Sequence, residues 1–209
     1  MLYDEIIAHR LGLIPLKTDL ESYTLPSECK CEGAGCARCQ TKLTLSYDDA
    51  GIVFAEELKP KDPKIKPVFG KEPIVKLLKG QKLEIEATAV LGMGKDHAKW
   101  SPGLVYYKHY PVIKVTGELK DLSLVEKFPK VFESKNGKIV INEEELIKSH
   151  LTDSVDEITG GAVEIDSKEN DFVFFVESWG QLECKEILEH AAGILGDKLD
   201  EFREVLGKK

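Results

Sequence analysis

The chain has 209 residues, of which 42% are hydrophobic and 32% charged, the composition of a folded globular protein and not of a disordered or fibrous one. Its net charge is −8, and residues 121–209 alone carry 11 basic against 21 acidic side chains, a poor surface for binding phosphates. No apolar run predicts a membrane span, and MLYDEIIAHR lacks the basic lead and apolar core of a signal peptide. These features predict a protein of the reducing cytoplasm, where clustered cysteines usually bind metal or perform redox chemistry.

The first predicted element is a short amphipathic helix within residues 4–16, DEIIAHRLGLIPL. Its aliphatic side chains cluster at helical spacing, and Gly12 and Pro15 mark its end. A loop that holds four of the five cysteines follows it, CKCEGAGCARC, residues 29–39.

The cysteine spacing in this loop is C-x-C-x4-C-x2-C, and Gly33 and Gly35 permit the tight backbone that four converging thiolates need. Tetrahedral sulfur coordination favours Zn²⁺, and a closed site with four ligands leaves no position for substrate or water. The sequence therefore predicts a structural zinc site. Its predicted ligands are Cys29, Cys31, Cys36 and Cys39.

Other uses of these thiols stay open on the sequence alone. An iron–sulfur cluster also takes four cysteines, although it usually recruits one from a distance. Free cysteines without metal are a further alternative, and so is thioredoxin-like chemistry at Cys36-x-x-Cys39, although this pair does not open a helix after a strand. Cys184 stands alone and is predicted to be a small buried apolar residue.

Two strands are predicted next. TKLTLSYD, residues 41–48, alternates apolar and polar side chains, and so does the segment from Leu83 to Ala89, which follows a short apolar segment and a turn at Gly80. Residues 118–168 then change character and resemble a small α+β insertion. A helix-like segment leads to a hairpin with Asn136-Gly137 at its turn, and a capped helix, NEEELIKSH, follows.

NDFVFFVESWG, residues 170–180, is predicted to be a buried strand, and a long helix from about Leu182 to Leu206 ends the chain. Apolar residues alternate by four and three along this helix, which indicates either a helix that faces the core or a dimerisation helix. The seam residues are Leu188, Ala192, Leu195, Leu199, Phe202 and Leu206.

No other motif predicts an autonomous active site. GMGK at residues 92–95 lacks the full Walker spacing and the following Ser or Thr, so a turn is expected. His97 and Trp100, in KDHAKWSP, have no further ligand or carboxylate at helical or hairpin spacing, which favours a structural or interface role.

Two segments carry a resemblance to a known family. LYDEIIAHRLGLIPL, residues 2–16, and GKDHAKWSPG, residues 94–103, look very like the D subunit of archaeal DNA-directed RNA polymerase. That family is similar to the third-largest subunit of eukaryotic RNA polymerase II and to the N-terminal domain of the bacterial α subunit. The cysteine loop lies where the eukaryotic relative carries its zinc loop, and the resemblance covers essentially the whole chain.

The resemblance implies an α+β fold with an α-subunit-like insert domain. Residues 1–110 would form this middle domain with its zinc loop, and residues 111–168 a ferredoxin-like insertion. Residues 169–209, a strand and the long helix, would be the C-terminal part of a dimerisation domain.

The implied function is that of a non-catalytic platform subunit in transcription. The chain would heterodimerise with the small subunit L through residues 169–209, and the pair would nucleate assembly of the large catalytic subunits alongside small assembly subunits. Nucleotidyl transfer would belong to the large subunits, and DNA would be reached only through the complex. The implied cofactor is structural Zn²⁺.

Two departures from the family pattern add expectations. The family begins with a strand and a helix that carries an N-A-L-R-R-like signature, whereas this sequence starts at Met1-Leu2-Tyr3-Asp4, after that region; we expect its dimerisation domain to be incomplete. Several archaeal relatives bind an iron–sulfur cluster in the insertion, but residues 111–168 contain no cysteine, so no cluster is expected.

Two rival interpretations belong to other classes of protein. One is a free-standing zinc-binding adaptor, which co-purification with polymerase subunits would distinguish. The other is a small thiol or zinc oxidoreductase that uses the C-x-x-C pair, which a closed site of four thiolates argues against.

Overall fold

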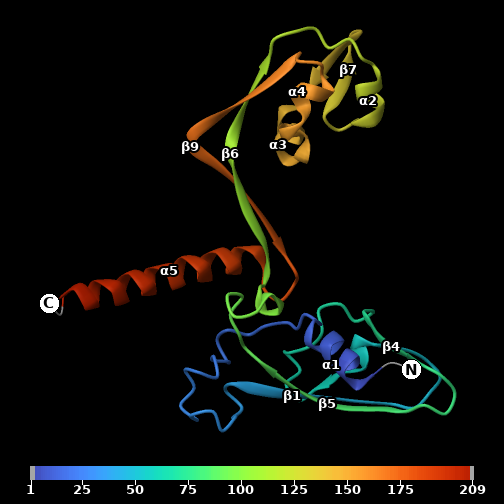
Figure 1. Cartoon of the computed structure of the whole chain (residues 1–209), viewed down its shortest axis with the longest axis vertical. Coiled ribbons are helices and arrows are strands. Elements are labelled where there is room, and N and C mark those ends of the chain that lie inside the picture. The colour runs from blue at the N-terminus through green and yellow to red at the C-terminus, as the bar shows by residue number, and fades with distance from the viewer. Residues whose placement is uncertain (1–2, 208–209) are drawn as a thin grey trace. The chain divides into compact units, whose positions relative to one another are not determined.

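The computed structural model describes residues 3–207, except for the side chain of His150, so Met1 and Leu2 of the predicted N-terminal start lie outside it. The chain forms two compact units, which Figure 1 shows with the elements labelled. Unit 1 joins the residues up to Val105 with those from Val176 onward, and unit 2 is Tyr106–Phe175. The predicted α+β class is confirmed.

Unit 1 contains two small antiparallel sheets and two helices. One sheet has the strand order β3-β1-β5, and the other pairs β2 with β4. Two 3₁₀ turns, η1 and η2, complete the unit. The bounds are α1 (Asp4–Gly12), β1 (Gln40–Tyr47), β2 (Gly51–Phe54), η1 (Ala55–Glu57), β3 (Lys59–Pro60), β4 (Pro73–Leu77), β5 (Leu83–Val90), η2 (Ala98–Trp100) and α5 (Cys184–Gly207).

The core of unit 1 forms because alternate residues of β1 face inward. Thr41, Leu43 and Leu45 are buried while the residues between them are exposed, as the period of two predicts. β1 pairs with β5 over its whole length, with Leu43 opposite Ala87. The buried side chains of this core are Ile14, Leu43, Leu45, Val53, Ala55, Leu58, Ile74, Val75 and Leu77.

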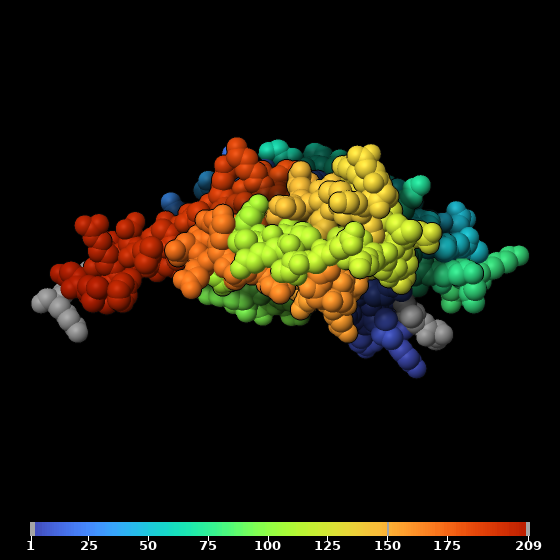
Figure 2. All heavy atoms as spheres, turned by 90° about the horizontal axis from the view of Figure 1, so that it is seen from above, coloured from blue at the N-terminus to red at the C-terminus, as the bar shows by residue number. Residues whose placement is uncertain are grey.

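Unit 2 is built from a long two-stranded ribbon, a short hairpin and small helices. The ribbon pairs β6 with β9, and the hairpin pairs β7 with β8. The elements are β6 (Gly103–Val115), α2 (Ser123–Lys127), β7 (Phe132–Lys135), β8 (Lys138–Ile141), α3 (Glu143–Lys148), η3 (His150–Asp153), α4 (Val155–Ile158) and β9 (Val163–Ser178). In Figure 2, which looks onto this unit, the green and orange spheres of the two ribbon segments lie against each other.

Two local predictions for unit 2, the hairpin turn and the helix cap, are confirmed. Asn136 and Gly137 have φ angles of 53° and 76°, the left-handed conformation that a two-residue hairpin turn requires. Asn142 caps α3 by accepting a hydrogen bond from the Glu145 N–H at 3.2 Å. A separate core gathers Leu124, Val131, Phe132, Leu146, Val155 and Val163.

The predicted buried strand at residues 170–180 is wrong in its burial. The segment as far as Ser178 is the second half of β9, but Phe172 and Phe174 are 48% and 60% exposed. The apolar run lies in a two-stranded ribbon, and a ribbon this narrow has a face that the described chain does not cover. The same ribbon stacks Tyr106 on Phe175, with ring centroids 4.8 Å apart.

The predicted insertion at residues 111–168 falls inside unit 2, which extends it by a few residues at each end. Within the described residues, the strands of unit 2 form two separate two-stranded sheets. The domain limits and the ferredoxin-like description stay predictions.

Candidate metal centre and partner surface

The four cysteine sulfurs of residues 29–39 meet at one point. All four Sγ atoms lie within 4.8 Å of one another. Individual separations are 3.5 Å for Cys29 to Cys36, 3.6 Å for Cys31 to Cys39, and 3.9 Å for Cys36 to Cys39. Tetrahedral zinc with Zn–S bonds of about 2.3 Å places its sulfurs about 3.8 Å apart. The geometry fits a four-thiolate metal site, and the structure thus groups the predicted ligands.

Tight turns of the loop backbone produce this convergence. The Glu32 N–H donates to the Cys29 carbonyl at 3.1 Å, and the Cys39 N–H donates to the Cys36 carbonyl at 3.1 Å. Gly33 and Gly35 have φ angles of 86° and 76°, which only glycine adopts without strain. The two predicted glycine positions therefore shape the site.

The thiols differ in their pKa. Hydrogen bonds from Cys29 and Cys39 lower the pKa of Cys31 to about 6. The Cys36 N–H, 3.3 Å from the Cys39 sulfur, lowers the pKa of Cys39, but burial and the neighbouring sulfurs outweigh it and raise that pKa to about 11. Four negative charges at this spacing repel one another, so a divalent cation is the partner that allows all four thiolates to form.

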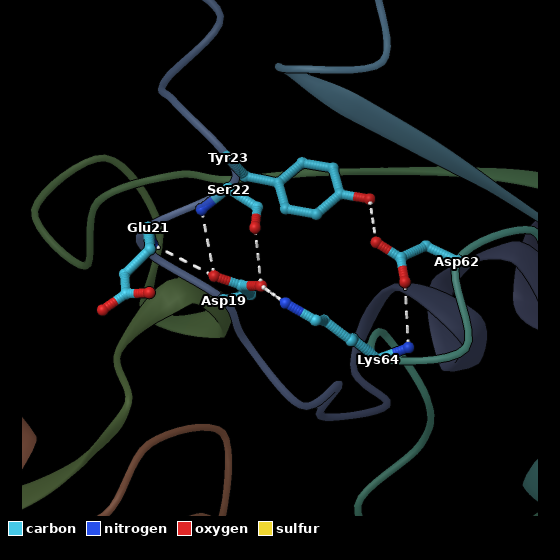
Figure 3. A network of polar contacts seen from close by, with 6 residues as sticks. All are labelled: Asp19, Glu21, Ser22, Tyr23, Asp62 and Lys64. Carbon is cyan, nitrogen blue, oxygen red and sulfur yellow. Dashed lines mark hydrogen bonds and ion pairs between the residues drawn. The ribbon is translucent and has the colours of Figure 1, made fainter.

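A polar network that no sequence motif predicts lies at the base of this loop, where the chain enters it. Figure 3 shows its residues. The Asp19 carboxylate accepts hydrogen bonds from the Lys64 ammonium at 2.9 Å and from the Ser22 hydroxyl at 2.8 Å. The Tyr23 hydroxyl donates to Asp62 at 2.8 Å, and Asp62 also accepts from the Lys64 N–H at 2.9 Å. No sequence signal identifies it, because its two halves are about 40 residues apart.

This network fixes the point where the chain enters the cysteine loop. Immediately after it, the Thr24 N–H donates to the Arg38 carbonyl at 2.8 Å, and Cys39 leads directly into β1. The hydrogen bonds from Lys64 and Ser22 hold the pKa of Asp19 far below its ordinary value of 3.8. Asp19 is therefore charged at neutral pH, and the entrance of the loop is held independently of any metal.

The second candidate site is the apolar seam of α5. Its large residues are exposed, from 46% for Leu188 to 62% for Phe202, so the alternative of a core-facing helix is wrong for this part of the chain. Ile187, one turn from the N-terminus of α5, is buried. The seam residues stay a predicted partner surface.

The start of α5 is fixed to unit 1 by backbone contacts. The Thr18 N–H donates to the Gln181 carbonyl at 3.1 Å, and the Trp179 N–H donates to the Pro102 carbonyl at 3.0 Å. The prediction that Cys184 is buried is wrong, because Cys184 is exposed in the first turn of α5. Its thiol donates to the Val176 carbonyl at 3.5 Å and lies at the surface.

The DHAKWSP segment shows a structural role for its aromatic residue. His97 Nδ1 accepts a hydrogen bond from the Lys99 N–H at 3.0 Å, and the Lys99 ammonium lies 4.5 Å from the centroid of the Trp100 ring. Trp100 also packs against Gly92, where any side chain would collide with the indole. The indole lines an apolar groove of about 1310 Å³ within unit 1.

Helices of the described residues 3–207 are all too short or too polar to cross a membrane.

Comparisons with known proteins agree with this geometry. Residues 2–104 match the model of the RNA polymerase Rpb3/RpoA insert domain. The DNA-directed RNA polymerase subunit Rpo3 of Methanosphaera stadtmanae is 38% identical over 95% of this chain and 77% of its own length. Rpo3 of Methanosarcina acetivorans is 38% identical over 99% and 79%, and Rpo3 of Pyrococcus furiosus is 36% identical over 99% and 78%. The chain therefore belongs to the Rpo3 family of archaeal DNA-directed RNA polymerase subunits.

Proposed function

We propose that this chain is a non-catalytic assembly subunit of RNA polymerase that binds the small subunit L through the α5 seam. The observation that carries the proposal is the exposure of that seam. All six seam residues, at heptad spacing on a helix of 24 residues, are exposed to solvent. A monomeric protein rarely exposes a continuous apolar stripe of this length, and such stripes mark interaction sites. The proposed partners are L and the large subunits, as the family resemblance implies.

The cysteine loop supports a structural role for the proposed zinc. The four ligands would be Cys29, Cys31, Cys36 and Cys39, and zinc bound there would cross-link the loop without taking part in a reaction. Because all four thiolates are used, the C-x-x-C pair is not free for redox exchange. This argues against the oxidoreductase alternative.

The proposal is tested by co-expressing the chain with L and the large subunits of its own organism and purifying through a tag on this chain. We expect L to co-purify in a 1:1 ratio and the large subunits to follow. Leu199→Asp should abolish recovery of L, because it introduces a charge into the centre of the seam. Glu201→Arg, an exposed change outside the six seam residues, is the matched control and should leave recovery unchanged.

A free-standing zinc-binding adaptor would give a different result. The tagged chain would then contain zinc but would be recovered without L and without the large subunits. That outcome would overturn the proposal, whereas zinc content alone distinguishes nothing, since both interpretations include it.

A further inference from the structure

The α5 seam has a size profile that is not uniform along its length. It alternates two sets of residues seven apart, the repeat of a coiled coil. The two sets are Leu188, Leu195 and Phe202, and Ala192, Leu199 and Leu206. Ala192 is the smallest residue in the seam and Phe202 the largest, and they belong to different sets.

This profile is self-complementary only when two copies of α5 run antiparallel. An antiparallel pair places residues of one set opposite residues of the other. Alignment about the level of residue 197 gives three layers, each formed twice: Leu188 with Leu206, Ala192 with Phe202, and Leu195 with Leu199 of the second copy. A parallel pair would instead place Ala192 against Ala192 and Phe202 against Phe202, which leaves a void in one layer and overfills another.

Charges along one edge of the seam favour the same orientation. In the antiparallel alignment Glu189 lies beside Arg203 of the second copy, and this opposite-charge pair also occurs twice. Gly196 lies between them, where the two helices come closest to their symmetry axis and a small residue fits. A parallel pair would bring Lys198 beside Arg203, which is repulsive.

In the single chain Glu189 contacts Lys185 at 3.6 Å, but both side chains are mostly exposed. Such a pair contributes little, so Glu189 can exchange it for Arg203 of a second copy at small cost. On the other edge, Lys198 would face Lys198 of the second copy. Both ammonium groups lie at the surface and can extend away from each other, yet this pair opposes association.

We propose that, when no other subunit covers it, the α5 seam binds a second copy of this chain in an antiparallel pair. The inference goes beyond the proposed function, but it uses the surface assigned there to L. Self-association and binding of L are therefore mutually exclusive.

Sedimentation equilibrium of the full chain without L tests the pairing. The wild type should be a dimer that dissociates on dilution. Glu189→Arg and Arg203→Glu should each weaken it roughly tenfold, because each converts two attractive contacts into repulsive ones. The double variant Glu189→Arg/Arg203→Glu should regain wild-type affinity, and Glu201→Arg is the control that changes charge away from the seam.

A mixture of the two single variants gives the sharpest result. Chains with Glu189→Arg carry arginine at both positions, and chains with Arg203→Glu carry glutamate at both. The mixed dimer has two attractive pairs, so it should form at concentrations where each variant alone is monomeric. Lys198→Gln should strengthen the wild-type dimer by removing the like-charge pair. A monomeric wild type, or no rescue in the double variant or the mixture, would overturn the proposal.

A titration with L separates this inference from the proposed function. If both hold, L converts the dimer into a 1:1 complex. A dimer that ignores L leaves the self-pairing intact and overturns the proposed function. A monomer that binds L overturns the self-pairing and leaves the proposed function intact.

Discussion

The cysteine loop and the α5 seam are both incomplete in the single chain, but they lack different things. Four sulfurs of the loop converge within 4.8 Å, so one ion satisfies them all. The seam spreads its six residues over about 27 Å of helix, a length that only another protein surface can cover. The proposed metal would act over the short range of the loop, and the proposed partner chain over the length of the seam.

The loop and the seam therefore affect different properties of the chain: the loop affects its folding stability, and the seam affects its association with other chains. The loop is closed by bonds within 11 residues, so its partner acts on folding of that segment. The seam is exposed while the cores of the two units are already buried, so the proposed partner would act after folding.

The largest expected effect is that of removing a metal ligand. Cys36→Ser should abolish stoichiometric zinc binding, because structural zinc contributes roughly 10–16 kcal/mol of apparent binding energy in small zinc-binding peptides. Metal analysis of the purified chain measures the loss, and hydrogen exchange should show lost protection in the loop but not in β1 or β5. Cys184→Ser is the control and should keep the zinc. Iron in place of zinc, or full zinc content in Cys36→Ser, would contradict the proposed site.

The second prediction compares the free energy of unfolding of two leucine variants, one in the core of unit 1 and one in the seam. Leu45→Ala should lower the free energy of unfolding by about 2–5 kcal/mol, since Leu45 is buried in the core of unit 1. Leu199→Ala should change it by less than about 0.5 kcal/mol, since Leu199 is 60% exposed. Urea denaturation at low protein concentration measures both. Equal losses would show that the seam is part of the folded core after all.

A smaller effect is expected from the loop backbone. Gly33→Ala should cost about 1–2 kcal/mol in the metal-bound state, because alanine must adopt the left-handed φ of 86°. Nothing within 4 Å would touch the added methyl group, so the loss reports the backbone alone. Competition with a zinc chelator should show roughly tenfold weaker binding. Gly12→Ala, at an ordinary φ and with open space around it, is the control that should bind zinc normally.

The smallest effect belongs to the network at the base of the loop. Asp19→Asn should lower the melting temperature at neutral pH, because it removes the charge that binds Lys64. The low pKa of Asp19 means that this stabilisation is present above pH 3.8 and lost as the pH falls through the depressed pKa. The pKa of Lys64 is raised by the same contact, so its share is lost only as the pH rises above 10.5.

The melting temperatures of the wild type and of Asp19→Asn should therefore differ by the same amount at every pH near neutral. The difference should shrink in acid. A difference that grows in acid would refute this assignment.

Local patterns alone predicted several features of this protein correctly. The four cysteines, the Asn136-Gly137 turn and the Asn142 cap depend on residues within a dozen positions of one another. Their geometry follows from bond lengths, backbone angles and short hydrogen bonds, which a sequence window contains. The alternation in β1 also predicted which of its side chains face the core.

Only the tertiary structure decided which apolar segments are covered by residues distant in the sequence. An apolar run specifies that a segment avoids water, but not whether the rest of the chain covers it. Phe174 and the α5 seam are as apolar as core residues and yet lie in solvent, because the available cores are filled by other segments. The contact between Asp19 and Lys64 was likewise invisible, since it joins residues 45 positions apart. Sequence determined the local geometry of the cysteine cluster, and folding determined which apolar surfaces stay exposed.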